Sequence, residues 1–154
     1  MENTKKKAFI FGSIFTLSNK LQIIGDRFDK RLTVKQWLLL AGIHNSQNKN
    51  PTISEVAVIV GNSRQNVKKM LLILEKSGFV TIETDSNDAR VQKVKMTNKC
   101  LNYLRQRENR ELEFLDQLFE GFESDEINEL MQAILKLEKN ILRLEGLNHD
   151  EEKE

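Results

Sequence analysis

The stretch that decides the fold is ISEVAVIVGNSRQNVKKMLLILEKSGFVTIE, residues 53–83. Apolar residues three and four positions apart predict a short helix over residues 55–60, for which Ser54 is the expected cap. Gly61 begins a turn signal, and the same apolar spacing predicts a second helix over residues 64–76. Two short helices joined across a glycine turn are typical of a helix-turn-helix.

A β-hairpin is expected directly after the second of these helices. Residues 79–83 are rich in β-branched side chains and alternate in polarity, which predicts a strand. Residues 84–89 are polar and rich in turn formers, and residues 90–96 alternate again. The position of this hairpin makes it the wing of a winged helix-turn-helix.

Further helices are expected on both sides of this region. Apolar periodicity predicts a helix with a wide apolar face over residues 8–28 and another over residues 33–44, capped by Thr33. After the hairpin, helices are expected over residues 98–119 and from Ser124 nearly to the end. The helix over residues 33–44 is apolar almost all round, and its inward stripe is expected to consist of Val34, Trp37, Leu38 and Ala41.

The charges are unevenly distributed along the chain. Its 24 Lys and Arg against 23 Asp and Glu give a net charge of only +1. Residues 63–99, however, carry eight basic and four acidic residues, whereas residues 145–154 carry one basic and five acidic residues. Phosphate contact requires a local basic surface rather than a high overall charge. The small sum therefore excludes only a protein that coats nucleic acid everywhere.

The outward face of the second helix is the candidate for reading DNA. Arginine can donate two hydrogen bonds to guanine, and Gln or Asn can pair with adenine, so Arg64, Gln65 and Asn66 are expected at base edges. The alternative is an ordinary solvated polar face. In the wing, Arg90 is long enough to enter a minor groove, and Asp88 either braces it or forms an exposed salt bridge worth about 0–1 kcal/mol.

Six short motifs occur in order between residues 32 and 97. They are LTVKQW (32–37), TISEVA (52–57), SRQNV (63–67), LEKSGFV (74–80), DAR (88–90) and VKMT (94–97). Each motif is weak alone, but the ordered set resembles the MarR family of transcriptional regulators. Asp88 and Arg90 supply the family's Asp-x-Arg wing pattern, while Met96 replaces a usual leucine and Cys100 a common glycine.

The expected fold is mainly α with a small β-hairpin wing. The resemblance implies that residues 32–97 form a winged helix-turn-helix DNA-binding domain. It also implies that residues 5–31 and 98–147 form a helical dimerisation region built from both termini, and residues 148–154 are expected to be a frayed acidic tail. The apolar surplus of the flanking helices independently favours a homodimer, because a large exposed apolar patch is a liability for a monomer.

The same resemblance implies a sequence-specific regulator of transcription. We expect the homodimer to bind a pseudo-palindromic operator in double-stranded DNA and to act as a repressor. Sequence alone does not separate a repressor from an activator, and the rival class is a helical protein-interaction module whose winged domain binds a protein partner. The residues expected at the DNA are Ser63, Arg64, Gln65, Asn66, Lys68, Lys69, Asp88, Arg90, Lys93 and Lys95.

Many members of the family release DNA when a small ligand binds between the dimer helices and the winged domain. A small aromatic or lipophilic effector is therefore a further expectation. Phe11, Phe15, Trp37 and His44 are the candidates to line its cleft. The alternative is that the three aromatic residues are plain core.

Other classes of protein find little support in the sequence. The two histidines belong to no cluster with metal-ligand spacing, and neither a phosphate-binding glycine motif nor a serine nucleophile elbow occurs, so we expect no enzyme, metal or cofactor. Cys100 is the only cysteine, and we expect a buried structural thiol rather than a redox sensor. No signal peptide and no apolar run near 18 residues are recognised, so we expect a cytoplasmic protein without a membrane partner.

Overall fold

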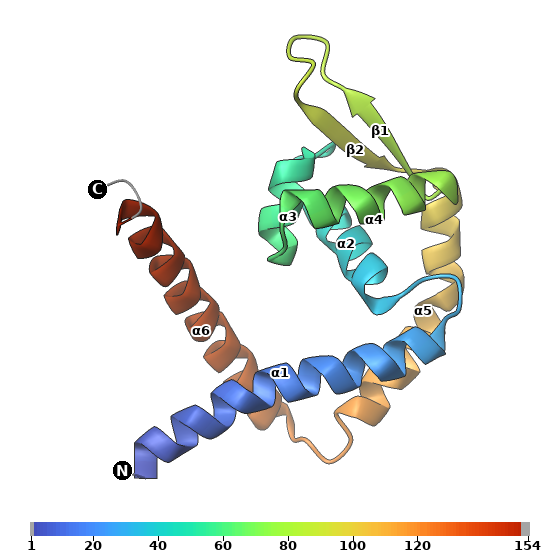
Figure 1. Ribbon diagram of the computed structural model, residues 1–154. Helices are drawn as coiled ribbons and strands as arrows, with labels where there is room; N and C mark the ends of the chain where they lie inside the picture. The colour runs from blue at the N-terminus through green and yellow to red at the C-terminus, as the bar shows by residue number, and fades with distance from the viewer. Residues whose placement is uncertain (1, 152–154) are drawn as a thin grey trace. The chain divides into compact units, whose positions relative to one another are not determined.

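The computed structural model describes residues 2–151 and shows the expected helices with one hairpin (Figure 1). The elements are α1 (Glu2–Phe28), α2 (Val34–His44), α3 (Ile53–Val60), α4 (Arg64–Lys76), β1 (Val80–Thr84), β2 (Gln92–Met96), α5 (Asn98–Leu118) and α6 (Ser124–Glu151). The chain divides into two compact units, Met1–Gln106 and Arg107–Glu154. The first unit contains the helix-turn-helix and the wing, so the candidate site lies within it.

The core of the first unit lies between α2, α3, α4 and the hairpin. Leu39 and Leu40 of α2 are fully buried, and so are Val56 of α3, Leu71 of α4 and Val94 of β2. Each such side chain removed from water contributes about 1.5–3 kcal/mol. This core fixes the two helices of the pair against the wing, so that the polar face of α4 is held outward.

The strands pair in antiparallel register from Val80 opposite Met96 to Thr84 opposite Gln92. Both begin slightly later than the sequence predicts, and the loop extends over residues 85–91. The reason is a pair of backbone hydrogen bonds that close the loop on itself. The Val91 nitrogen donates to the Asp88 oxygen, and the Val91 oxygen accepts from the Asp85 nitrogen. Residue 90 therefore lies in the loop and not in the ladder.

The predicted caps are correct for α2 and α4 and wrong for α3. The expected cap, Ser54, lies inside α3, and Thr52 occupies the N-cap position instead. The Thr52 hydroxyl accepts from the backbone nitrogen of Glu55 at 3.1 Å, and a Glu55 carboxylate oxygen accepts from the Thr52 nitrogen at 2.7 Å. This reciprocal capping box satisfies two helix-terminal donors at once, which a cap at Ser54 does not offer.

The predicted inward stripe of α2 is wrong in detail. Its buried residues are Leu39, Leu40, Gly42 and Ile43, whereas Trp37 and Leu38 are exposed. Because the helix is apolar almost all round, periodicity does not select one face. The helices packed against it decide which residues are inward.

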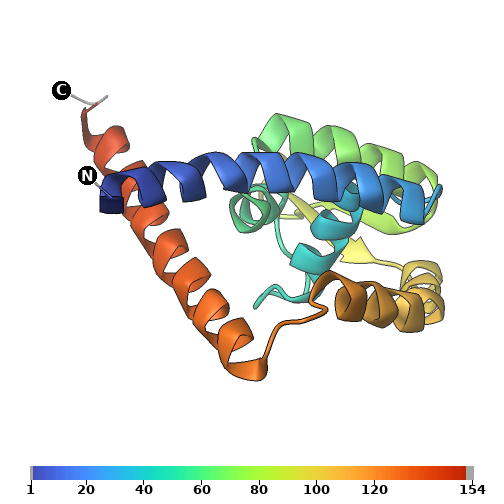
Figure 2. The same ribbon diagram turned by 90° about the horizontal axis from the view of Figure 1, so that it is seen from below.

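Helix α1 is a single long helix that begins at Glu2, six residues before the predicted start (Figure 2). It meets α2 near its C-terminal end, where an Asp26 carboxylate oxygen accepts from the Val34 nitrogen at 2.8 Å. By length and composition alone it is apolar enough to cross a membrane, with a mean hydropathy of 1.2 over 18 residues. This corrects the expectation that no apolar run approaches that length, although the core helix of a soluble protein and a signal sequence pass the same test.

Helix α6 continues to Glu151. Four residues of the tail that was expected to be frayed, 148–151, are therefore helical, because nothing after Gly146 interrupts helix formation. Residues 152–154 lie outside the described part of the chain.

Candidate nucleic-acid interface

The turn between α3 and α4 sets where the second helix begins. Gly61 ends α3 with a φ of 64°, a left-handed conformation that favours glycine. The Ser63 hydroxyl accepts from the backbone nitrogen of Asn66 at 3.2 Å, as predicted for the cap of α4. Asn62 Oδ1 accepts from the Ser63 nitrogen at 2.8 Å and from Asn66 Nδ2 at 3.3 Å. The first turn of α4 is thus held by the residues that precede it.

The first turn of α4 presents its polar side chains to solvent. Arg64, Gln65, Asn66 and Lys69 are exposed, whereas Lys68 is half-buried. One amide donor of Asn66 already bonds within the turn. Within residues 2–151, neither Arg64 nor Gln65 makes a side-chain hydrogen bond or ion pair. These two side chains therefore have their donors available for a ligand.

Helix α4 and the wing meet at a cavity of about 530 Å³. Its lining brings Arg64 of α4 together with Arg90 of the wing, Gln92 of β2, and Thr52 and Ser54 at the start of α3. Two guanidinium groups line this opening and no carboxylate does, so it favours an anion of the phosphate type.

The Arg90 guanidinium is held by Asp88 within the wing loop. Nε lies 3.1 Å from Asp88 Oδ1, Nη2 lies 3.1 Å from Oδ2, and the Arg90 backbone nitrogen donates to Oδ1 at 3.0 Å. The side-chain hydrogen bond from Arg90, and then the backbone one, lower the pKa of the Asp88 carboxyl. The Arg90 side chain is still 90% exposed, so the pair orients a guanidinium that faces solvent.

Lys93 takes part in an ion pair that the sequence did not reveal. Its Nζ lies 3.1 Å from Oδ2 of Asp85, and Asp85 Oδ1 accepts from the Asn87 nitrogen at 2.8 Å. The hydrogen bond from Asn87, followed by that from Lys93, lowers the pKa of the Asp85 carboxyl. The register offered a signal, because Asp85 lies two positions beyond Glu83, the residue opposite Lys93. Lys95 is exposed on the same strand and, within the described residues, has no ion pair.

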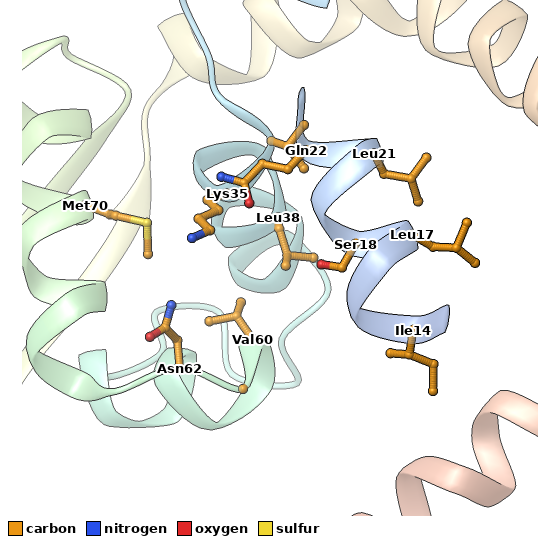
Figure 3. A pocket seen from close by; sticks show the side chains of 12 residues that line it. Ile14, Leu17, Ser18, Leu21, Gln22, Lys35, Leu38, Val60, Asn62 and Met70 are labelled. Atoms are coloured by element: carbon orange, nitrogen blue, oxygen red, sulfur yellow. The ribbon is translucent and has the colours of Figure 1, made fainter. Parts of the chain in front are cut away.

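The predicted ligand residues are divided between two helices, α1 and α2. Phe11 and Phe15 are neighbours on α1, with ring centroids 5.2 Å apart in an edge-to-face arrangement, and both are exposed. Trp37 is 37% exposed on α2, and His44 is exposed at the end of the same helix. None of these four lines the cavity of about 580 Å³ that α1 and α2 form with the turn before α4 (Figure 3).

Comparison with known families matches residues 32–91 to the MarR family. Within these residues the chain is therefore similar to the MarR family. The matched segment runs from two residues before α2 to the end of the wing loop and carries five of the six motifs, since VKMT (94–97) lies beyond it. The MarR family consists of transcription regulators, which are not enzymes.

Solved structures share this fold over most of the chain. A MarR/EmrR family transcriptional regulator from Acinetobacter sp. ADP1 is 18% identical, covers 89% of this chain and 97% of its own, and superposes with a TM-score of 0.77. A complex of S. aureus MepR with DNA gives 19% identity, coverages of 86% and 97%, and a TM-score of 0.72. BpsR of Bordetella bronchiseptica is 14% identical, covers 83% of this chain and 98% of its own, and superposes with a TM-score of 0.71. The chain therefore has the fold of the MarR-family transcriptional regulators.

Proposed function

We propose that the protein is a transcriptional regulator that binds double-stranded DNA sequence-specifically. The observation that carries the proposal is the cavity where Arg64 of α4, Arg90 of the wing and the start of α3 converge. The DNA-bound MepR structure, which has the same fold, supports DNA as the anion. The net positive charge of residues 63–99 supplies the sequence-independent part of the affinity.

The side chains take different roles in this proposal. Arg64 and Gln65 read base edges, with Asn66 contributing its remaining hydrogen-bonding groups, and Arg90, oriented by Asp88, enters the minor groove. Ser63 caps the reading helix. The phosphate contacts come from Lys68, Lys69 and Lys95, and Lys93 contributes less than expected because Asp85 partly neutralises it.

The active form in this proposal is a homodimer. Large apolar side chains are exposed on α1, such as Phe9 at 75%, and on α6, such as Leu142 at 56%. A second copy of the chain covers both faces, and a two-fold dimer places two recognition helices about one DNA turn apart. Light scattering of the purified protein tests this step. A monomer at micromolar concentration contradicts it, and Leu142→Glu is expected to shift the mass towards the monomer.

We further propose that the protein works in the cytoplasm as a repressor released by a small effector. BpsR, a protein of the same fold, has its DNA binding regulated by 6-hydroxynicotinic acid. A dimer that occupies an operator by its helix-turn-helix blocks transcription when that operator overlaps a promoter. Reporter expression with and without the gene distinguishes repression from activation.

The decisive experiment is a selection of bound fragments from the native genome, followed by titration of a selected duplex. We expect specific binding that weakens steeply between about 50 mM and 200 mM salt, because contacts to phosphates release counterions. Binding without salt dependence, or none at low salt, contradicts the proposal. Such a result favours the rival reading, in which the winged domain binds a protein.

A further inference from the structure

Asn62 lies between Gly61, which ends α3, and Ser63, which caps α4. Its backbone nitrogen donates to the Ala57 oxygen at 3.0 Å, which fixes the residue against the end of α3. Its amide oxygen accepts twice, from the Ser63 nitrogen at 2.8 Å and from Asn66 Nδ2 at 3.3 Å. The Asn62 side chain therefore connects the end of α3 to an exposed side chain in the first turn of α4.

These two contacts fix which way round the Asn66 amide lies. A backbone N–H can only donate, so the Asn62 atom beside the Ser63 nitrogen is the oxygen of its amide. The Asn66 atom that faces this oxygen must donate in turn, so it is Nδ2. The backbone nitrogen of Asn66 is also held, by the Ser63 hydroxyl at 3.2 Å. Both the backbone and the amide of Asn66 are thus oriented before any base arrives.

The oriented amide of Asn66 offers one donor and one acceptor to a ligand. Asn62 takes one of its two N–H groups, and within residues 2–151 neither the other N–H nor Oδ1 has a partner. In the major groove adenine presents the acceptor N7 and the donor N6, which complement this pair. Guanine presents two acceptors, N7 and O6, so its O6 would lie against the Asn66 oxygen. An amide with two free N–H groups can turn both towards guanine, whereas the amide held by Asn62 cannot.

Gln65 provides the contrast in the same turn of α4. Its side chain is exposed and, in the part of the chain that the structure describes, makes no hydrogen bond. Its amide is therefore free to present either end to a base, and its longer side chain loses more rotamer freedom when a base fixes it. We expect sharper discrimination at the base that Asn66 contacts than at the base that Gln65 contacts.

We propose that Asn62 is a positioning residue for base recognition and that it makes Asn66 selective for adenine over guanine. The operator then carries an adenine at the base pair that Asn66 contacts. This selectivity rests on the proposed DNA-binding function. The bond between the two amides does not, and it is measurable in the free protein.

Nuclear magnetic resonance of the isotope-labelled full chain tests the bond between the two amides without DNA. We expect one of the two Asn66 side-chain amide protons to be shifted downfield, and we expect Asn62→Ala to remove this shift. Asn62→Asp keeps an acceptor oxygen at the same place and is expected to keep the shift. Asn66 protons that do not respond to Asn62→Ala overturn the positioning role.

Anisotropy titration of a selected duplex locates the adenine. Each adenine in turn is replaced by 7-deazaadenine, which lacks the N7 acceptor and keeps its pairing with thymine. At one position in a half-site we expect the wild type to bind at least about threefold more weakly, the usual loss for one hydrogen bond. Asn66→Ala is expected to show no further loss at this position. If no adenine gives this pattern, Asn66 does not read adenine.

Replacing that A·T pair by G·C tests the part played by Asn62. We expect the wild type to bind the G·C duplex at least about tenfold more weakly, as for a bidentate contact. Asn62→Ala is expected to bind the two duplexes within about threefold of each other, because the freed amide of Asn66 can then donate twice. Asn62→Asp should keep the preference at a lower overall affinity, since its negative charge acts on both duplexes alike. An unchanged preference in Asn62→Ala overturns the proposal.

Asn48→Ala is the matched control for the loss of an exposed amide hydrogen bond. Asn48 Nδ2 donates to Glu55 Oε1 at 2.8 Å at the start of α3. This variant loses a bond of the same kind without touching Asn66, so we expect it to keep the full preference for A·T. A preference that Asn48→Ala and Asn62→Ala lose equally would mean that general loosening of the helix pair, and not the orientation of Asn66, is responsible.

The inference and the proposed function fail in different ways. If no duplex is bound even at low salt concentration, the proposed function is wrong and the selectivity falls with it. If a duplex is bound with the expected salt dependence and no adenine responds through Asn66, this inference alone is wrong.

Discussion

Lys93 Nζ lies 3.1 Å from Oδ2 of Asp85, an acid whose side chain is only 18% exposed. The wing therefore carries less free positive charge than its sequence indicates. Lys93 is one of the lysines expected at the DNA backbone, and its counterion is built into the wing loop. This pair is open to direct tests.

Asp85→Asn is expected to release Lys93 and strengthen DNA binding. The slope of log affinity against log salt concentration should become steeper by about 0.9, the value of one additional phosphate contact. Glu83→Gln is the matched control, because it changes the net charge equally beside Lys93 and leaves the ion pair in place. Equal slopes for the two variants would show that Lys93 makes no phosphate contact.

The same substitution has a defined effect on acid stability. The folded-state pKa of Asp85 is lowered from its ordinary value of 3.8. A carboxyl of this kind stabilises the fold above its unfolded-state pKa, and that contribution is lost as the pH falls through the folded-state pKa. The difference in free energy of unfolding between the wild type and Asp85→Asn should be constant above about pH 5 and shrink below about pH 4. Urea titrations across this range measure it, and a difference that does not vary between pH 3 and 6 contradicts the pairing.

Arg64→Ala is expected to cost about 1–3 kcal/mol of affinity for the cognate duplex and to narrow the gap between cognate and random DNA. The reason is that a base contact acts on specificity, whereas a phosphate contact does not. Lys69→Ala is the comparison and should weaken both duplexes alike. Competition titrations provide the measurement. Equal losses on both duplexes for Arg64→Ala mean that this side chain contacts the backbone instead.

Gly25→Ala is expected to destabilise the protein. A Cβ at this position would lie 2.0 Å from Cγ2 of Val34, so α1 and α2 must separate locally, at a cost of about 1–3 kcal/mol. Gly12→Ala is the matched control on the same helix, because nothing lies within 4 Å of its Cβ. It should gain about 0.5–1 kcal/mol from the better helix former. Urea denaturation that ranks the two variants in the opposite order refutes the close approach of α1 and α2.

Cys100 is expected to be unreactive in the folded protein. It is fully buried, and burial raises the pKa of its thiol to about 11, so little thiolate is present at neutral pH. Iodoacetamide at pH 8 should label it slowly in the native state and rapidly in urea, where the pKa returns to about 8.5. Labelling at the unfolded rate in native buffer would reopen a redox role.

The helix pair was predictable because its signals are local. Spacing of three and four identified α3 and α4, and the members of that pattern in α4 lie inward, with Val67, Leu71 and Leu74 buried and Met70 half-buried. Where two local signals competed, the prediction of the cap was wrong. Ser54 and Thr52 are both good caps, and the choice of Thr52 depends on the reach of the Glu55 carboxylate.

By itself, the sequence determined the order of the elements, the basic segment that faces outward on α4, and the resemblance that the family comparison bears out. These features depend on residues close together in the chain. Tertiary structure alone decided which face of α2 is buried, that Asp85 neutralises Lys93, and that Arg64 and Arg90 share a cavity. Each of these results from side chains that folding brings together from separate elements, and periodicity along one element carries no information about its neighbours.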